Sequence, residues 1–126
     1  MGIGAPGKET ESFRQKAFVI RGTAVWIDLS DASPPEMGKR RPAVIVSNSI
    51  QNTALDSVVA VPLSSRPPEI PPLRVRVCLP GLKDPGFAVI PGIRQVKKSR
   101  ILRAIGAISR ADLASVAAAI GEYLSD

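Results

Sequence analysis

Residues 38–47 constrain the fold more than any other part of this 126-residue sequence. Three consecutive cations at 39–41 stop at Pro42, and the apolar run 43–46 begins at once. Proline fixes φ and donates no ladder hydrogen bond, so it suits the first residues of a strand. An apolar run without polar alternation is typical of a strand covered on both faces. The stretch therefore predicts a cationic loop that leads into a buried β-strand.

Further short apolar runs, separated by Gly, Pro and Ser, predict six more strands. They cover residues 23–29, 58–63, 73–79, 87–90, 93–96 and 105–108. Pro62 indicates that its strand ends at an edge or a bulge. The segment 64–72 contains four prolines, which exclude a helix, and residues 47–52 carry turn chemistry.

One helix is expected at the C-terminus. Ser109 is a typical N-cap, and Asp112 follows it three residues later. Beyond it, apolar residues follow one helical face, at Leu113, Val116, Ala117, Ile120 and Leu124. Short strands plus one terminal helix predict a mainly β fold, a small closed or nearly closed antiparallel barrel, because closure removes exposed sheet edges.

Composition excludes several kinds of site. The chain has no histidine and one cysteine, which excludes His-dependent catalysis, an internal disulfide and a structural zinc site. The net charge is +6, and residues 36–103 carry twelve basic and four acidic groups. This concentration of positive charge in mid-chain is expected where one face meets a polyanion, although a merely solubilising surface is the alternative.

The two ends of the chain suggest its organisation and location. Residues 1–17 lack hydrophobic periodicity and are expected to form a disordered extension, followed by a single domain over 18–126. No secretory h-region and no run of membrane-spanning length is visible, so we expect a cytoplasmic protein without membrane contact.

Five segments carry a family pattern in the right order: residues 21–29, 36–47, 61–65, 93–100 and 105–108. Through them the sequence resembles the MazF/PemK family of toxin ribonucleases from bacterial toxin–antitoxin pairs. The resemblance implies an SH3-like barrel of the CcdB/PemK type, a homodimer, and no metal or cofactor. It also implies cleavage of single-stranded RNA, such as mRNA, to a 2′,3′-cyclic phosphate and a 5′-hydroxyl. The implied partner is a cognate antitoxin with an acidic segment.

The resemblance also implies the site residues. The catalytic arginine of the family falls on Arg41, its catalytic threonine on Ser64, and an acidic loop residue on Glu36. Ser64 keeps the hydroxyl but lacks the β-branch that stiffens χ1. Gly92 stands where the family often has an acidic or amide residue, a departure that bears on base recognition.

The chemistry of these residues suits phosphodiester cleavage. A planar guanidinium such as that of Arg41 grips two phosphate oxygens, and the Ser64 hydroxyl can hold the same phosphate. Proton transfer is assigned to Glu36, the carboxylate nearest to this centre in sequence. The alternative is that Glu36 only pairs with Lys39 or Arg40 across its loop.

RNA is expected to lie between the loops 30–40 and 64–72. Side chains expected to contact it are Lys39, Arg40, Ser65, Arg66 and, as an addition, Arg94. The two arginines of the 73–79 strand, Arg74 and Arg76, are expected to be solvated. Trp26 is expected in the core or in a dimer contact, and Phe87 in the core.

Two other functions remain open at this point. The first is a binding module of the CcdB type, which poisons DNA gyrase; the chain end, Glu122 to Asp126, matches its apolar C-terminal segment poorly. The second is an RNA-binding barrel without activity, which Ser64 and Gly92 make conceivable.

Overall fold

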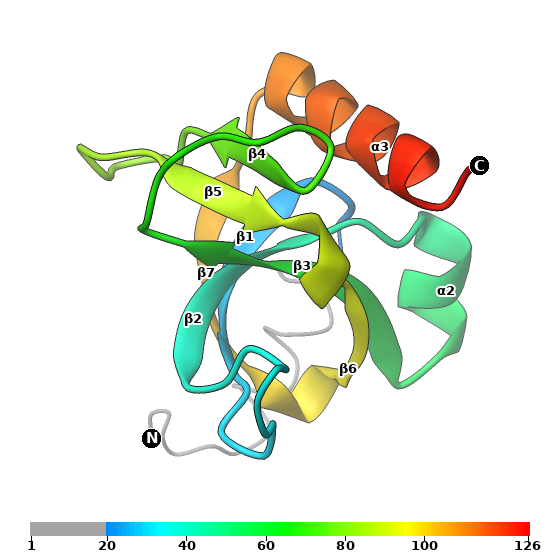
Figure 1. Ribbon diagram of the computed structural model, residues 1–126. Helices are drawn as coiled ribbons and strands as arrows, with labels where there is room; N and C mark the ends of the chain where they lie inside the picture. Colours follow the sequence, from blue (N-terminus) through cyan, green and yellow to red (C-terminus); the bar gives the residue numbers. More distant parts are fainter. Residues whose placement is uncertain (1–19) are drawn as a thin grey trace.

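Seven antiparallel strands and a C-terminal helix make up most of the protein (Figure 1). The structure is a computed structural model that describes residues 20–126, so the extension expected at 1–17 lies outside the described residues. The strands are β1 (Thr23–Asp28), β2 (Arg40–Ile45), β3 (Ser57–Ser64), β4 (Arg74–Val77), β5 (Gly86–Val89), β6 (Arg94–Lys97) and β7 (Ile101–Ala107). The helical elements are α2 (Ser49–Ala54), the 3-10 turns η2 (Ile90–Gly92) and η3 (Lys98–Arg100), and α3 (Arg110–Tyr123). The predicted mainly β fold with a C-terminal helix is confirmed.

Strand β3 joins the two halves of the sheet. The strand order is β4-β5-β3-β2-β1-β7, and β6 also pairs with β3. Residues 57–60 of β3 pair with β6, whereas Leu63 and Ser64 pair with β5. Pro62, which lacks an N–H group, lies between these two pairings. The edge position expected from Pro62 is therefore wrong, because the proline marks a change of partner inside a central strand.

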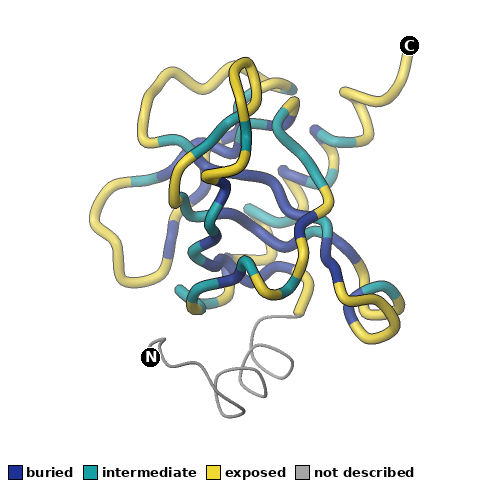
Figure 2. Tube along the Cα trace, turned by 90° about the horizontal axis from the view of Figure 1, so that it is seen from below, coloured by how far each residue is buried: buried dark blue, intermediate teal, exposed yellow. Residues whose placement is uncertain are grey.

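Two clusters of buried side chains fill the molecule, one on each face of β1, β2 and β3. The buried stretches of the chain, dark blue in Figure 2, run through its interior. Ala43 and Ile45 of β2 pack into the cluster enclosed by β1, β2, β3, β6 and β7. Val44, between them, packs into the cluster that β4, β5 and α3 cover. The uninterrupted apolar run of β2 is thus explained, because both of its faces are buried.

Helix α3 covers the β4–β5 side of the sheet (Figure 1). Ser109 caps it as expected, since its hydroxyl accepts a hydrogen bond from the Asp112 amide at 3.0 Å. The Asp112 carboxylate does not complete a capping box; its Oδ2 accepts from the Cys78 amide at 2.9 Å and so ties α3 to β4. Leu124 lies one residue beyond the helix and is 72% exposed. Within residues 20–126, no helix is long and apolar enough to cross a membrane.

Two elements differ from the sequence-based expectation. The residues expected to form only a turn at 47–52 include the start of α2, which Asn48 caps by accepting from the Gln51 amide at 3.1 Å. The buried Asn52 side chain donates to the Ser47 carbonyl at 2.8 Å and so folds the helix back onto the chain. The last strand begins at Ile101 rather than at 105, because pairing with β1 extends it across two register shifts.

Candidate active site

Arg41 is the second residue of β2. It pairs with Ile27 of β1, and its Nε donates a hydrogen bond to the carbonyl oxygen of Gly38 at 2.7 Å. No other hydrogen bond of this side chain occurs within residues 20–126. One edge of the guanidinium is therefore anchored to the protein, while its terminal Nη groups remain available to a ligand.

Ser64 lies at the end of β3, where it pairs with Phe87 of β5. Its hydroxyl oxygen accepts a hydrogen bond from the Arg66 amide at 3.1 Å. Accepting this bond fixes the oxygen in place and leaves the hydroxyl hydrogen free to donate. Strand β2 pairs with β3, so the ends of neighbouring strands carry Arg41 and Ser64.

Arg41 and Ser64 line the same pocket, which has a volume of about 450 Å³. Residues of β1, β2, β3 and the β4–β5 connection form its wall. Two more of the expected RNA-contacting residues, Arg40 and Ser65, also line it. Lys39 and Arg66 are exposed; Lys39 directly precedes Arg40 in sequence and Arg66 directly follows Ser65, but neither lines the pocket itself.

Glu36 and Arg94 lie elsewhere. Both line a second, smaller pocket of about 220 Å³, together with Gly92. The Glu36 carboxylate accepts from the Ser33 amide at 3.2 Å, and it makes no ion pair within the described residues. The proximity in sequence that suggested Glu36 as the proton-transfer group therefore does not bring it into the Arg41–Ser64 pocket.

The packing of Gly92 explains why this position carries a glycine. A Cβ atom built there would lie 2.8 Å from Cγ of Pro62. That distance is too short for a real contact, so a side chain at this position would displace the η2 turn from β3. The departure from the family pattern at this position is thus tied to the proline of β3.

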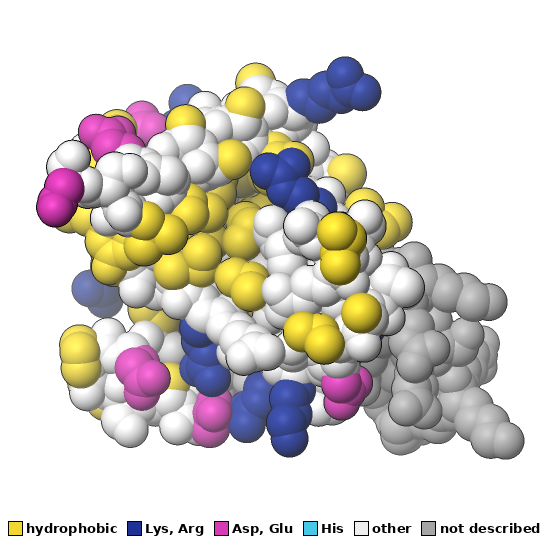
Figure 3. Space-filling view, turned by 90° about the vertical axis from the view of Figure 1, so that its right-hand side faces the viewer, with side chains coloured by type: hydrophobic (Ala, Val, Ile, Leu, Met, Phe, Trp, Pro, Cys, Tyr) yellow, Lys and Arg dark blue, Asp and Glu magenta, His cyan; other side chains and the backbone are white. Residues whose placement is uncertain are grey.

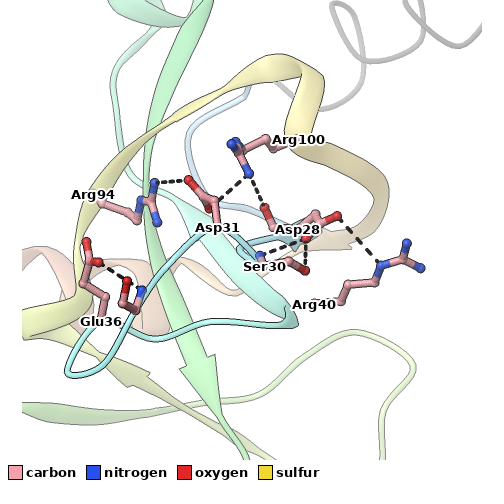
Figure 4. Close-up of polar contacts among 8 residues, drawn as sticks. Asp28, Ser30, Asp31, Glu36, Arg40, Arg94 and Arg100 are labelled. Atoms are coloured by element: carbon pink, nitrogen blue, oxygen red, sulfur yellow. Dashed lines mark hydrogen bonds and ion pairs between the residues drawn. The ribbon is translucent and has the colours of Figure 1, made fainter.

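Ion pairs hold the loop between β1 and β2 at its base (Figure 4). Asp31 lies 3.0 Å from Nη1 of Arg100 and 3.7 Å from Nη2 of Arg94. The Leu29 amide donates to the carbonyl of Lys39 at 2.8 Å, which closes the loop. Arg94 is thereby engaged by a carboxylate of the protein, so its positive charge is partly neutralised before any RNA binds.

Asp28, at the end of β1, has a lowered pKa. The main cause is the hydrogen bond that its carboxylate accepts from the Ser30 hydroxyl, followed by the Ser30 amide at 2.9 Å. The positive charges of Arg40 and Arg100 lower the pKa further. All of these partners favour the ionised carboxylate, so protonation of Asp28 weakens the contacts that order the β1–β2 loop.

We expect Asp28 to contribute to the loss of stability in acid. A carboxyl group whose pKa is lower in the folded state stabilises the fold above its unfolded-state pKa, and this contribution disappears as the pH falls through the folded-state pKa. Between about pH 5 and pH 2, the urea midpoint of the wild type should therefore fall more steeply than that of Asp28→Asn. Asp126→Asn is the control: its carboxylate is exposed, so its urea midpoint should fall with pH as steeply as that of the wild type. Equal slopes for all three proteins would contradict the prediction.

The pocket also contains residues that sequence reasoning missed. Trp26, expected in the core or in a dimer contact, lines the pocket instead of the core, and the dimer contact stays a prediction; the guanidinium of Arg103 lies 5.8 Å from the centroid of its ring. Lys83 and Asp84, from the β4–β5 connection, line it as well. Phe87 is buried as expected. Arg74, expected to be solvated, is half-buried, and its Nη2 donates to the Arg66 carbonyl at 2.7 Å, which pins the β3–β4 loop.

Within residues 20–126, no three His, Cys, Asp or Glu side chains gather closely enough to hold a metal ion. Among the described residues, the pocket offers two guanidinium groups, one ammonium group, two hydroxyl groups and one carboxylate. An arrangement of positive charge and hydroxyl donors suits the binding of a phosphate group.

Comparison with known proteins decides the family. Residues 20–124 match the model of the PemK-like, MazF-like toxins of type II toxin–antitoxin systems. The chain belongs to the PemK/MazF toxin family. It is 31% identical to Endoribonuclease MazF9 of Mycobacterium tuberculosis (strain ATCC 25618 / H37Rv) over 114 residues, which cover 84% of this chain and 97% of that protein.

Solved structures of PemK/MazF toxins have the same fold. The crystal structure (form I) of MazF from Deinococcus radiodurans superposes with a TM-score of 0.72 at 27% identity, covering 83% of this chain and 94% of that one. An endoribonuclease from a mycobacterial species, solved in complex with its cognate antitoxin, gives a TM-score of 0.68 at 25% identity, with coverages of 83% and 93%. None of the matches described here is a gyrase-poisoning toxin, so the CcdB-type alternative gains no support.

Proposed function

We propose that this PemK/MazF toxin is an endoribonuclease that cleaves single-stranded RNA, messenger RNA included, in the Arg41–Ser64 pocket. The observation that carries the proposal is that the arginine and the serine, from two paired strands, line one pocket. The name of the 31% identical relative, an endoribonuclease, supports it independently.

In the proposed reaction, the RNA supplies its own nucleophile. The 2′-oxygen loses its proton and bonds to phosphorus while the bond from phosphorus to the 5′-oxygen breaks and that oxygen takes up a proton. The products are a 2′,3′-cyclic phosphate and a 5′-hydroxyl, and no metal is required. Arg41 would stabilise the charge that develops on the phosphorane oxygens, and Ser64 would donate to one of them. Both groups are held before the RNA arrives, which is the condition for effective electrostatic stabilisation.

The remaining cations are proposed to position the RNA. Arg40 and Ser65 line the pocket, and the exposed side chains of Lys39 and Arg66 flank it. Contacts of this kind to neighbouring phosphates give affinity that falls with salt. Arg94 is proposed only as a distant contact, because its guanidinium is already paired with Asp31.

Proton transfer by Glu36 remains a prediction that the geometry does not favour. The Glu36 carboxylate lines the neighbouring pocket and accepts from the Ser33 amide. We therefore expect Glu36→Gln to retain kcat/KM for RNA cleavage within about threefold of the wild type, since a glutamine oxygen can still accept that bond. A loss of about 10²-fold or more would instead identify Glu36 as a proton-transfer group that reaches the RNA after a loop movement.

The experiment that tests the function is incubation with a mixed RNA pool, followed by mapping of the 5′-hydroxyl ends. Cleavage should persist in EDTA; its abolition by EDTA would indicate metal-dependent chemistry. Tight binding of uncut RNA by the wild type would support the inactive RNA-binding barrel instead. Trapped DNA breaks in a gyrase assay, with RNA left intact, would restore the CcdB-type function.

The proposed partners are a second copy of the chain and a cognate antitoxin, in the cytoplasm. Apolar side chains gather in a hollow on the face shown in Figure 3, a surface available to a second copy. The related mycobacterial toxin was solved with its antitoxin. An acidic antitoxin segment over the cationic loop would exclude RNA by competition, and binding that survives charge reversal at Lys39 and Arg40 would count against this. The domain is proposed to span residues 18–126.

A further inference from the structure

The Arg41–Ser64 pocket extends well beyond what a phosphate group requires. Arg40, Arg41, Lys83, Ser64 and Ser65 supply its cationic and hydroxyl-bearing part. Six apolar side chains form much of the remaining wall: Trp26, Pro42, Leu63, Leu79, Leu82 and Pro85. An apolar wall of this kind makes no hydrogen bond or ionic contact with a phosphate. It suits the flat faces of a nucleobase, which proteins bind by stacking and apolar contact.

The connection between β4 and β5 forms another part of the wall, and two hydrogen bonds and a glycine turn order it. Gly81 has φ +75° and follows Pro80, and the Leu82 amide donates to the Leu79 carbonyl at 3.1 Å, as in a type II turn. At the start of the turn, Cys78 donates its amide to the carboxylate of Asp112 on α3. Leu82 remains 49% exposed, although it lines the pocket. This turn therefore keeps the apolar side chain of Leu82 accessible to a ligand.

Asp84 is the one carboxylate among the described residues that line this pocket. Within residues 20–126, its side chain accepts no hydrogen bond and forms no ion pair. An ionised carboxylate only accepts hydrogen bonds, and it repels the phosphates of RNA. Beside a phosphate-binding arginine, this exposed carboxylate contributes to RNA binding where the RNA brings a hydrogen-bond donor to it. The donors of that kind on a base are its amino and ring N–H groups.

We propose that the apolar part of this pocket takes a base adjacent to the cleaved phosphodiester, and that Asp84 selects a base with an exocyclic amino group over uracil. The inference rests on the ribonuclease function proposed above and adds a specificity-determining residue to it. Adenine, cytosine and guanine each present an amino group on the edge used for pairing, whereas uracil presents there a single ring N–H flanked by two carbonyl oxygens, which repel a carboxylate. Trp26, held against Arg103, contributes an aromatic wall to the same space.

The test uses four sets of oligonucleotides that differ only at the nucleotides on either side of the mapped cleavage site. At one of these two positions, the wild type should cleave substrates with adenine, cytosine or guanine at least about tenfold faster, in kcat/KM, than the substrate with uracil. Asp84→Asn should reduce this ratio to within about threefold while cleavage continues, because an amide both donates and accepts and so accommodates uracil. Asp56→Asn replaces an exposed carboxylate that lines a different pocket and should keep the wild-type ratio.

Several results would overturn the inference. Uracil as the preferred base at both positions in the wild type contradicts it without any variant, and so does an Asp84→Asn protein that keeps the wild-type ratio. An equal loss of cleavage on all four substrates would assign Asp84 to proton transfer rather than to base selection. Failure of the wild type to cut any RNA would instead refute the ribonuclease function, so the two failures are distinguishable.

Discussion

Arg41→Ala should lower kcat/KM for RNA cleavage by about 10²- to 10³-fold, the loss typical of removing one preorganised charge-stabilising donor. The truncation removes the guanidinium that lines the pocket, together with its bond to the Gly38 carbonyl. Most of the loss should appear in kcat, because the developing charge of the transition state is what the guanidinium is proposed to stabilise. The measurement is single-turnover cleavage of a labelled oligonucleotide, followed by the appearance of the 5′-hydroxyl product.

Two further variants show whether geometry or charge accounts for the effect at Arg41. Arg41→Lys keeps the charge but loses the planar fork, so it should recover only part of the activity. Arg76→Ala removes an exposed arginine of β4, outside the pocket, and should leave kcat/KM nearly unchanged. All three proteins should keep the wild-type far-UV circular dichroism. Wild-type cleavage by folded Arg41→Ala would refute the proposed active site.

Ser64→Ala should lower kcat/KM by about 10- to 100-fold, the cost of losing a hydrogen bond to a charged group. The smaller effect is expected because the hydroxyl contributes a neutral donor, whereas Arg41 contributes a full charge. The backbone should tolerate the change, since the lost bond is a local one from the Arg66 amide at the edge of the pocket. The same single-turnover assay measures the effect, with thermal melts to check folding.

Ser64→Thr tests whether the hydroxyl group accounts for the effect of Ser64→Ala. Threonine keeps the hydroxyl and restores the β-branch that limits χ1, and it suits the strand backbone at this position. Its activity should equal or exceed that of the wild type. Ser115→Ala, on the exposed face of α3, serves as the control. If Ser64→Ala and Ser64→Thr both cleaved like the wild type, Ser64 would be only a turn residue.

The strands and α3 were predictable because their signals are local. Proline, glycine and the apolar run at 43–46 determine where β2 begins and why both of its faces are buried. The errors arise where long-range contacts decide. Ile101 and Ala104 are three residues apart, an interval that does not fit the two-residue alternation of a strand. Their pairing with β1 is what makes residues 101–104 part of β7. Likewise, α2 is too short for a periodic pattern and depends on the buried Asn52.

The candidate site was predictable only in part, for the same reason. Arg41 and Ser64 stand in segments that resemble the family, and their common pocket agrees with that resemblance. Nothing local in the sequence indicates that Asp84 reaches this pocket, since the β4–β5 connection meets β2 and β3 only through the topology of the sheet. Conversely, Glu36 is a near neighbour of Arg41 in sequence, but the β1–β2 loop directs it to another pocket.

The position of β4 at the end of the strand order has a consequence for how such toxins diversify. Among the strands of residues 20–126, β5 alone pairs with β4, whereas the strands that carry Arg41 and Ser64 are each paired on both sides. Substitutions at the exposed positions 81–84 of the 79–85 turn therefore affect one peripheral hairpin and leave the strands that carry Arg41 and Ser64 in place. Substitutions in this turn can then change which RNA sequences are cleaved without changing the chemistry of cleavage. Exchanging this turn between relatives should transfer sequence preference with little change in maximal rate.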